Sequence, residues 1–153
     1  MSDVMRRKLT TILAADVAGY SRLVREDVEA TLRALHEHRT ELFEPLIEQY
    51  GGRIANTAGD SLLLEFPSAV DALRFAIAFQ EGMAKREADV EPSRQIQFRA
   101  GVIVGDVITE GRDLLGSGVN VAARLEALAE PGGIVLSRSA RDQVRDQLKL
   151  ALE

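Results

Sequence analysis

A short apolar run near the start of the chain, residues 9–17 (LTTILAADV), constrains the fold more than any other segment. Its length, its apolar content and the glycine that follows it predict a buried strand that ends at Asp16. The strand leads into a turn whose free backbone amides can face phosphate oxygens. The residues of this turn are Val17, Ala18, Gly19, Tyr20 and Ser21.

Two later segments have the three-to-four spacing of amphipathic helices. In residues 26–50 the apolar positions are Leu32, Leu35, Leu42, Phe43, Leu46, Ile47 and Tyr50. This pattern predicts a helix that ends at Gly51-Gly52 and has a kink or a break at Pro45. A second helix is predicted to open at Pro67-Ser68 and to end at the polar segment 85–94.

Strand patterns separate these helices. Residues 53–57 and 61–66 are two short strands, and Ala58-Gly59-Asp60 between them predicts a hairpin. Residues 95–104 alternate between apolar and polar side chains, which is typical of a half-buried strand. Gly105-Asp106 is then expected to turn the chain into a returning strand at 107–109.

The last third of the chain adds a glycine-containing loop at 110–118, a helix at 119–128, a strand at 134–136 and a helix at 137–148. The whole order predicts an α+β fold with a ferredoxin-like β-α-β-β-α-β core and a C-terminal extension. Its antiparallel sheet is expected to carry helices on one face. The other face is of mixed polarity, so a partner subunit is expected to cover it.

Composition narrows the possible functions. The net charge of −5 argues against nonspecific nucleic-acid binding, which depends on clustered lysine and arginine. No cysteine occurs, so disulfides, thiolate metal sites and cysteine nucleophiles are excluded, and a cytoplasmic location is the default expectation. The sequence contains no run of about eighteen apolar residues, the length that a membrane-spanning helix requires. His36 and His38 are two residues apart and are expected to be solvated on the first long helix.

Asp16 and Asp60 stand at the ends of two strands that are expected to be neighbours. If these strands pair, the two carboxylates converge on one edge of the sheet. Hard oxygen ligands of this kind suit Mg²⁺ or Mn²⁺ bound to a nucleotide. The alternative is that both are ordinary turn or capping aspartates.

Four sequence segments decide between these alternatives. Residues 14–21 (AADVAGYS) and 51–60 (GGRIANTAGD) resemble the two metal-binding signatures of class III nucleotidyl cyclases, in particular the bacterial adenylate cyclase type. Residues 113–124 (DLLGSGVNVAAR) resemble the substrate and transition-state segment of that family, and residues 130–134 (EPGGI) resemble the stretch that follows it. The resemblance therefore covers nearly the whole chain, and it implies one catalytic domain over residues 1–153.

The resemblance implies a homodimer with active sites between the subunits, in which Asp16 and Asp60 hold two divalent metal ions, Mg²⁺ or Mn²⁺. It implies that Arg99 holds the triphosphate, that Asn120 orients the ribose, and that Arg124 stabilises charge at the phosphate. Without the resemblance, Arg99 could be a solvated strand arginine, and the other two could be surface residues on one helical face.

Asp113 matches the family position that reads the base, where a carboxylate accepts a hydrogen bond from the adenine amino group and favours ATP. Asn56 stands where adenylate cyclases usually have a lysine, and guanylate cyclases a glutamate. A family lysine that contacts the triphosphate would fall beyond Glu153, together with the closing strand of the usual domain. An adenylate cyclase, a weakly active or non-catalytic nucleotide-binding module and a guanylate cyclase are thus the hypotheses, and fused or associated regulatory domains are common in this family.

Overall fold

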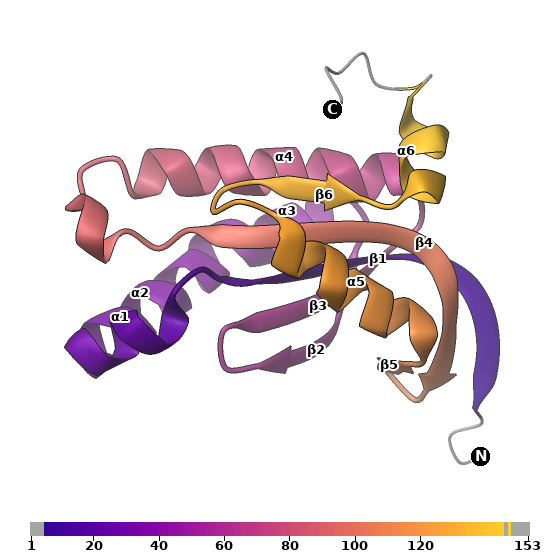
Figure 1. The fold of residues 1–153 in the computed structure, drawn as a ribbon, viewed down its shortest axis with the longest axis horizontal. Helices are drawn as coiled ribbons and strands as arrows, with labels where there is room; N and C mark the ends of the chain where they lie inside the picture. The colour runs from indigo at the N-terminus through magenta and orange to yellow at the C-terminus, as the bar shows by residue number, and fades with distance from the viewer. Residues whose placement is uncertain (1–4, 146, 148–153) are drawn as a thin grey trace.

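The structure is a computed structural model, and it describes residues 5–145 and 147 (Figure 1). The strands are β1 (Arg6–Val17), β2 (Arg53–Ala58), β3 (Ser61–Phe66), β4 (Phe98–Glu110), β5 (Asp113–Leu115) and β6 (Ile134–Leu136). The helices are α1 (Tyr20–Glu26), α2 (Val28–His38), α3 (Glu44–Gln49), α4 (Ala69–Arg86), α5 (Ser117–Leu128) and α6 (Arg138–Val144). A π-helical turn, η1 (Arg39–Phe43), joins α2 to α3, and a 3₁₀ turn, η2 (Pro92–Arg94), precedes β4.

The sheet has the strand order β2-β3-β1-β4-β5, and β6 adds a parallel partner to β4. All other pairs are antiparallel. The predicted α+β class, the antiparallel sheet and the ferredoxin-like order of the first four strands are therefore confirmed. The hairpin of β2 and β3 is also present, as the sequence predicts.

The larger hydrophobic core lies on the face of the sheet that carries Leu13, Ala15 and Val17 of β1. Side chains of α1, η1, α3, α4 and α6 pack against it. At its centre, the ring of Phe43 lies 4.7 Å from that of Phe79 and 5.2 Å from that of Phe98, measured between centroids. The period-two alternation of β1 then turns Ile12, Ala14 and Asp16 to the opposite face.

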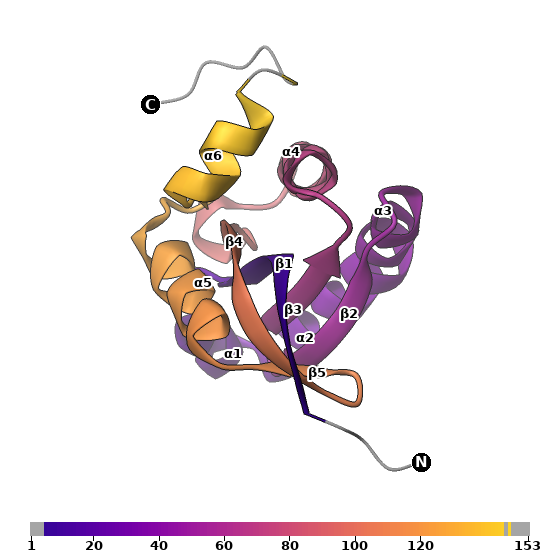
Figure 2. The ribbon, with the colours of Figure 1, turned by 90° about the vertical axis from the view of Figure 1, so that its right-hand side faces the viewer.

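The opposite face is not left wholly to a partner, because α5 packs on it (Figure 2). The residues at this contact are Ile12, Ala14, Ile103, Val107, Leu114 and Ala122. The prediction that the helices lie on one face of the sheet is therefore right for the helices of the larger core and wrong for α5, which packs on the opposite face. A glycine permits its close approach: a Cβ built on Gly101 of β4 would lie 2.6 Å from the backbone nitrogen of Glu126.

One turn prediction is wrong. Gly105-Asp106 does not reverse the chain, because β4 continues through it in register with Thr10 and Leu9 of β1. β1 offers a partner along its whole length, so ladder hydrogen bonds outweigh the local turn preference. The reversal comes at Gly111, whose φ of 62° suits a glycine, and the returning strand is β5.

The helix predicted over residues 26–50 is present as the consecutive segments α2, η1 and α3, and a separate short helix, α1, precedes it. Asp27 has an extended backbone and accepts a hydrogen bond from the amide of Ala30, so it ends α1 and caps α2. The expected irregularity near Pro45 is present as the π-helical turn η1 just before it. A proline nitrogen donates no hydrogen bond, and a wider turn accommodates the carbonyl that loses its partner.

The prediction of two solvated histidines is right for His36 and wrong for His38, which is only 5% exposed. The Nε of Arg86 donates to His38 Nδ1 at 2.8 Å, and His38 Nε2 lies 3.4 Å from an oxygen of Glu87. Burial lowers the pKa of His38, the Glu87 carboxylate opposes this, and Arg86 and Glu37 add smaller effects of opposite sign. The histidine therefore joins the ends of α2 and α4 in its neutral form.

No helix in residues 5–145 is both long and apolar enough to cross a membrane.

We predict that the free energy of unfolding falls as the pH drops below 6.5, the ordinary pKa of histidine. The unfolded chain binds a proton there that the folded His38 resists, so the slope reaches at most about 1.4 kcal/mol per pH unit. Urea unfolding between pH 5 and pH 7.5 measures it. His38→Gln should flatten this part of the profile and the exposed His36→Gln should not, and equal slopes in both variants would contradict the prediction.

Candidate active site

The pairing of β1 with β3 brings Asp16 and Asp60 together at one edge of the sheet. Ala15 lies opposite Leu62 in this pairing, so the tip of the hairpin reaches the end of β1. There the backbone amide of Val17 donates to Oδ2 of Asp60 at 3.0 Å. The convergence that the sequence predicts is therefore present, with one aspartate on a strand and the other at a hairpin tip.

The electrostatics of this edge favour a cation. Burial raises the pKa of Asp60, the amide of Val17 opposes this, and the negative charge of Asp16 raises it further. A divalent cation would stabilise both ionised carboxylates, so the donor set fits Mg²⁺ or Mn²⁺. Within residues 5–145, no three His, Cys, Asp or Glu side chains are arranged to hold a metal ion on their own. Oxygen atoms from water or a ligand would have to complete the coordination.

A third carboxyl at this edge, that of Glu126 on α5, was not predicted from the sequence. Glu126 is 7% exposed. Burial and the neighbouring Asp16 raise its pKa to about 8, Arg99 opposes the shift, and Asp60 adds to it. The signal in the sequence is its position four residues after Ala122, on the face that α5 turns to the sheet. An ionisable residue on that face is a departure from the amphipathic pattern.

Arg99 lies directly opposite Asp16 in the pairing of β1 with β4. Its side chain is on the same face of the sheet as Asp16 and Glu126. The Nε of Arg99 is buried and has no hydrogen-bond partner in the described part of the chain. A buried donor without a partner lowers the stability of the fold, so this guanidinium is suited to donate hydrogen bonds to an anionic ligand.

The turn after β1 offers fewer free amides than the sequence suggests. The amide of Val17 binds Asp60, and the amide of Ala18 donates to the carbonyl of Gln97 at 2.8 Å. Gly19, with a φ of 67°, then starts α1. The amides of Tyr20 and Ser21 lie in the first turn of this helix, where they have no partner within the helix.

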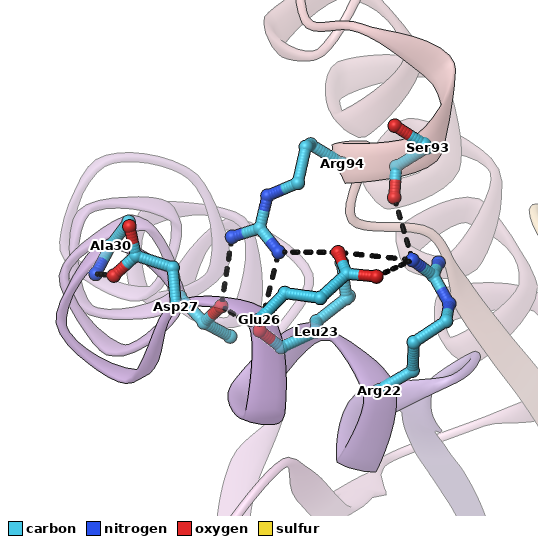
Figure 3. Close-up of polar contacts among 8 residues, drawn as sticks. Arg22, Leu23, Glu26, Asp27, Ala30, Ser93 and Arg94 are labelled. Atoms are coloured by element: carbon cyan, nitrogen blue, oxygen red, sulfur yellow. Dashed lines mark hydrogen bonds and ion pairs between the residues drawn. The ribbon is translucent and has the colours of Figure 1, made fainter.

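An arginine and glutamate network fixes this turn to the segment before β4 (Figure 3). Arg94 donates to the carbonyl of Leu23 at 3.3 Å and to Glu26 at 3.0 Å. Arg22 donates to Glu26 at 3.2 Å and to the carbonyl of Ser93 at 2.8 Å. Arg94 first, and then Arg22, lowers the pKa of Glu26. The turn and the strand that carries Arg99 are thereby connected through side chains as well as through the sheet.

The other predicted site residues lie elsewhere in the same chain. Asn120 and Arg124 are exposed on α5, on a side that does not face the sheet. Asp113 pairs with Glu110 at the far end of β4, about 36 Å from Arg99 along the strand. Asn56 is exposed on β2 beside a bulge. In a single chain, Asp113 and the outward side of α5 are thus separate from the edge that carries Asp16 and Arg99.

Large apolar side chains are also exposed on β5 and α5. Val121, Leu125 and Leu128 give residues 119–128 their helical spacing, and of these Val121 is 37% exposed and Leu128 is 73% exposed. Leu115 on β5 is 39% exposed. The small residues Gly118 and Ala122 face the sheet instead, so α5 turns large apolar side chains outward.

Comparison with known proteins agrees with this fold. The family described as the adenylate and guanylate cyclase catalytic domain matches residues 4–151. The chain belongs to this family. A solved structure of an adenylate/guanylate cyclase/hydrolase from Silicibacter pomeroyi is similar, with a TM-score of 0.91 and 41% identity over 98% of this chain and 87% of that one.

The sequence is also similar to bacterial proteins named as adenylate cyclases. The putative adenylate cyclase 3 of Rhizobium meliloti (strain 1021) is 46% identical over 93% of this chain and 24% of its own length. An adenylate cyclase of Streptomyces coelicolor is 30% identical over 85% of this chain and 32% of its own length. This chain therefore spans about a quarter to a third of the length of these relatives.

We predict that Asp60→Asn stabilises the metal-free protein at pH 7. The folded pKa of Asp60 is raised, so its ionisation above the ordinary value of 3.8 opposes folding, while an amide oxygen can still accept from Val17. The gain should be on the order of 0.5 kcal/mol because the carboxyl is only partly buried. Urea unfolding with EDTA measures it, with the exposed Asp106→Asn as the control. A loss of stability in Asp60→Asn alone would contradict the prediction.

Proposed function

We propose that the chain is the catalytic domain of an adenylate cyclase, which converts ATP into 3′,5′-cyclic AMP and pyrophosphate. The observation that carries this proposal is the convergence of Asp16 and Asp60 beside Arg99, whose buried Nε has no partner among the residues that the structure describes. The names of the bacterial relatives as adenylate cyclases support the same activity.

In this proposal Asp16 and Asp60 hold two Mg²⁺ or Mn²⁺ ions. Such ions lower the pKa of an attacking hydroxyl and neutralise negative charge on a triphosphate. Arg99 binds the triphosphate through its guanidinium, and the amides that open α1 add hydrogen bonds. The ribose 3′-oxygen attacks the α-phosphorus, and pyrophosphate leaves on the opposite side.

We propose that Asn120 and Arg124 of each site come from a second copy of the chain. Asn120 would orient the ribose, and Arg124 would stabilise the charge that develops at the phosphate. Both are exposed on α5, where the outward-facing apolar side chains favour contact with a partner. A twofold dimer would then form two equivalent sites, each completed by the other subunit.

Asp113 is proposed to select adenine. One of its carboxylate oxygens accepts from the amide of Leu114 at 2.8 Å, which fixes its orientation and leaves the other oxygen for an amino group. Guanine offers a carbonyl at that position and would be disfavoured. Asn56 would donate to a ring nitrogen without adding positive charge.

A weakly active or non-catalytic nucleotide-binding module of the same fold is the second candidate. Asn56 favours it, because an amide does not balance the charge of Asp113. Guanylate cyclase activity is a third hypothesis, which requires that GTP outcompete ATP. We place the domain in the cytoplasm, where ATP is available, and expect a regulatory domain in the same protein or bound to it.

Product analysis with ATP or GTP, each with Mg²⁺ or Mn²⁺, tests the activity. The protein should form cyclic AMP, and Asp60→Asn should reduce the rate by roughly 100-fold or more because charge stabilisation at the phosphates is lost. The exposed Asp106→Asn should keep the rate. Nucleotide binding in calorimetry without turnover would support the module, and faster turnover of GTP would support the guanylate cyclase.

Mixing two inactive variants tests the shared site. Asp60→Asn and Arg124→Ala each remove one half of every site in a homodimer. In the mixed dimer, one site loses both residues and the other keeps both. Unfolding and refolding the two variants together should therefore restore about a quarter of the wild-type rate through random pairing. No recovery, with mixed dimers demonstrated, would exclude a site shared between the subunits.

A further inference from the structure

The two edge strands β2 and β5 come together although they stand at opposite ends of the sheet. The strand order is β2-β3-β1-β4-β5, and the ladders within the described residues include none between β2 and β5. The sheet curls so that β5 turns toward β2 and contacts it (Figure 2). Without a ladder, the relative position of these two edges depends on side chains that cross between them.

Arg53 on β2 makes such a crossing. Its Nη1 donates to the carbonyl of Arg112 at 2.7 Å, and its Nε donates to Oε1 of Glu65 on β3 at 2.8 Å. The second oxygen of Glu65 lies 2.8 Å from Nζ of Lys8 and accepts from Thr10 at 2.6 Å. Glu65 is only 9% exposed. This carboxylate is therefore fixed from β1, and because a guanidinium is planar, the hydrogen bond to Nε also sets the direction of Nη1.

The acceptor on the hairpin of β4 and β5 is the peptide group that leads into Asp113. The carbonyl of Arg112 and the nitrogen of Asp113 share one planar peptide bond, so a hydrogen bond to this carbonyl orients the backbone of both residues. On the other side, Oδ1 of Asp113 accepts from the amide of Leu114 at 2.8 Å. A cavity of about 640 Å³ lies against the tip of the hairpin at Gly111 and Arg112, so close packing does not hold the tip in place. Arg53 supplies a contact that packing does not.

A bulge in β2 brings Asn56 to the side of the sheet that carries Arg53. The ladder of β2 with β3 pairs Arg53 with Glu65 and Asn56 with Leu63, with a register shift between the two pairs. Glu65 and Leu63 are two residues apart on β3, so they point to one face, and their cross-strand partners share it. Without the extra residue of the bulge, Asn56 would point to the opposite face. The Arg53 side chain and Asn56 are therefore on the same surface of β2.

Both predicted base-reading residues are thus linked to Arg53, Asn56 through β2 and Asp113 through the peptide group before it. Selection between adenine and guanine depends on the alignment of donors and acceptors, and hydrogen bonds weaken steeply when they are misaligned. We propose that Arg53, anchored by Glu65, is a positioning residue that holds Asp113 in a fixed place relative to Asn56 and so sets the preference for the base. The effect on base choice rests on the proposed function, whereas the contact between the two edges is a property of the chain by itself.

The first test measures hydrogen exchange in the metal-free protein without nucleotide. Arg53→Lys keeps a positive charge beside Glu65, but one ammonium does not reproduce the two-pronged geometry of the guanidinium. The amides of residues 110–115 should exchange about 10-fold faster in this variant, the effect of losing one hydrogen bond. The amides of β4 near Arg99 should exchange at the wild-type rate.

The control is Arg7→Met, which removes an exposed charge from β1 opposite Ile108, beside the same hairpin. Its hairpin amides should exchange as in the wild type. Thermal unfolding establishes that each variant is folded, and Arg53→Met gives the same test if the lysine variant does not fold. Wild-type exchange at residues 110–115 in the folded variant at position 53 would overturn the proposal, whatever the protein catalyses.

The second test compares kcat/KM for ATP with kcat/KM for GTP. Arg53→Lys should lower this ratio by roughly 10-fold, the effect of losing one aligned hydrogen bond to a base, with most of the change in KM for ATP. In the Asp113→Asn background the same substitution should change the ratio no further, because both act through one carboxylate. An unchanged ratio in Arg53→Lys, or an equal loss in both backgrounds, would overturn the specificity role. If the wild type turned over neither nucleotide, the proposed function would fail, and hydrogen exchange would still decide the positioning role.

Discussion

The antiparallel ladder between β1 and β4 is the interaction on which the rest of the structure depends. It runs without a register shift from Arg6 opposite Thr109 to Val17 opposite Phe98. Because side chains alternate along β1, one face of the sheet carries Leu13 and the larger core, and the other face carries Asp16. β3, β5 and β6 attach to it on either side, and α5 packs across it. A one-residue slip would exchange the two surfaces, so the hydrophobic core itself fixes where the carboxylate points.

The face that carries Asp16 combines features that selection for stability alone would not favour. Two aspartates converge, a glutamate is buried near them, and an arginine donor lacks a partner in the described part of the chain. Each of these lowers the stability of the metal-free chain, and each is relieved by a cation or an anion. A cluster of destabilising ionisable groups at one edge is typical of sites that bind charged ligands. It agrees with the membership of the chain in the cyclase family.

Sequence patterns predicted the parts of the fold that are set locally. The run before Asp16, the hairpin at Asp60 and the strand that carries Arg99 all follow from short-range spacing. The patterns failed where a distant partner decided the outcome: β1 held Gly105-Asp106 in an extended strand, and Arg86 with Glu87 buried His38. Glu126 was missed for the same reason, because only the packing of α5 on β4 shows which side of that helix is covered. The roles of Asn120, Arg124 and Asp113 stay predictions, since they concern contacts that a single chain does not contain.

The contact of α5 with β4 has a mechanical consequence. Gly101 and Gly118 remove the layer of side chains that normally separates a helix from a sheet, so the backbones of the two elements touch. Side chains can change rotamer and absorb a small displacement, whereas two backbones in contact cannot. A push on the outer surface of α5, from a second subunit or an attached domain, should therefore move β4 with it. The helix and the strand would move as one rigid unit, so a displacement of α5 would also change the position of Arg99 on β4.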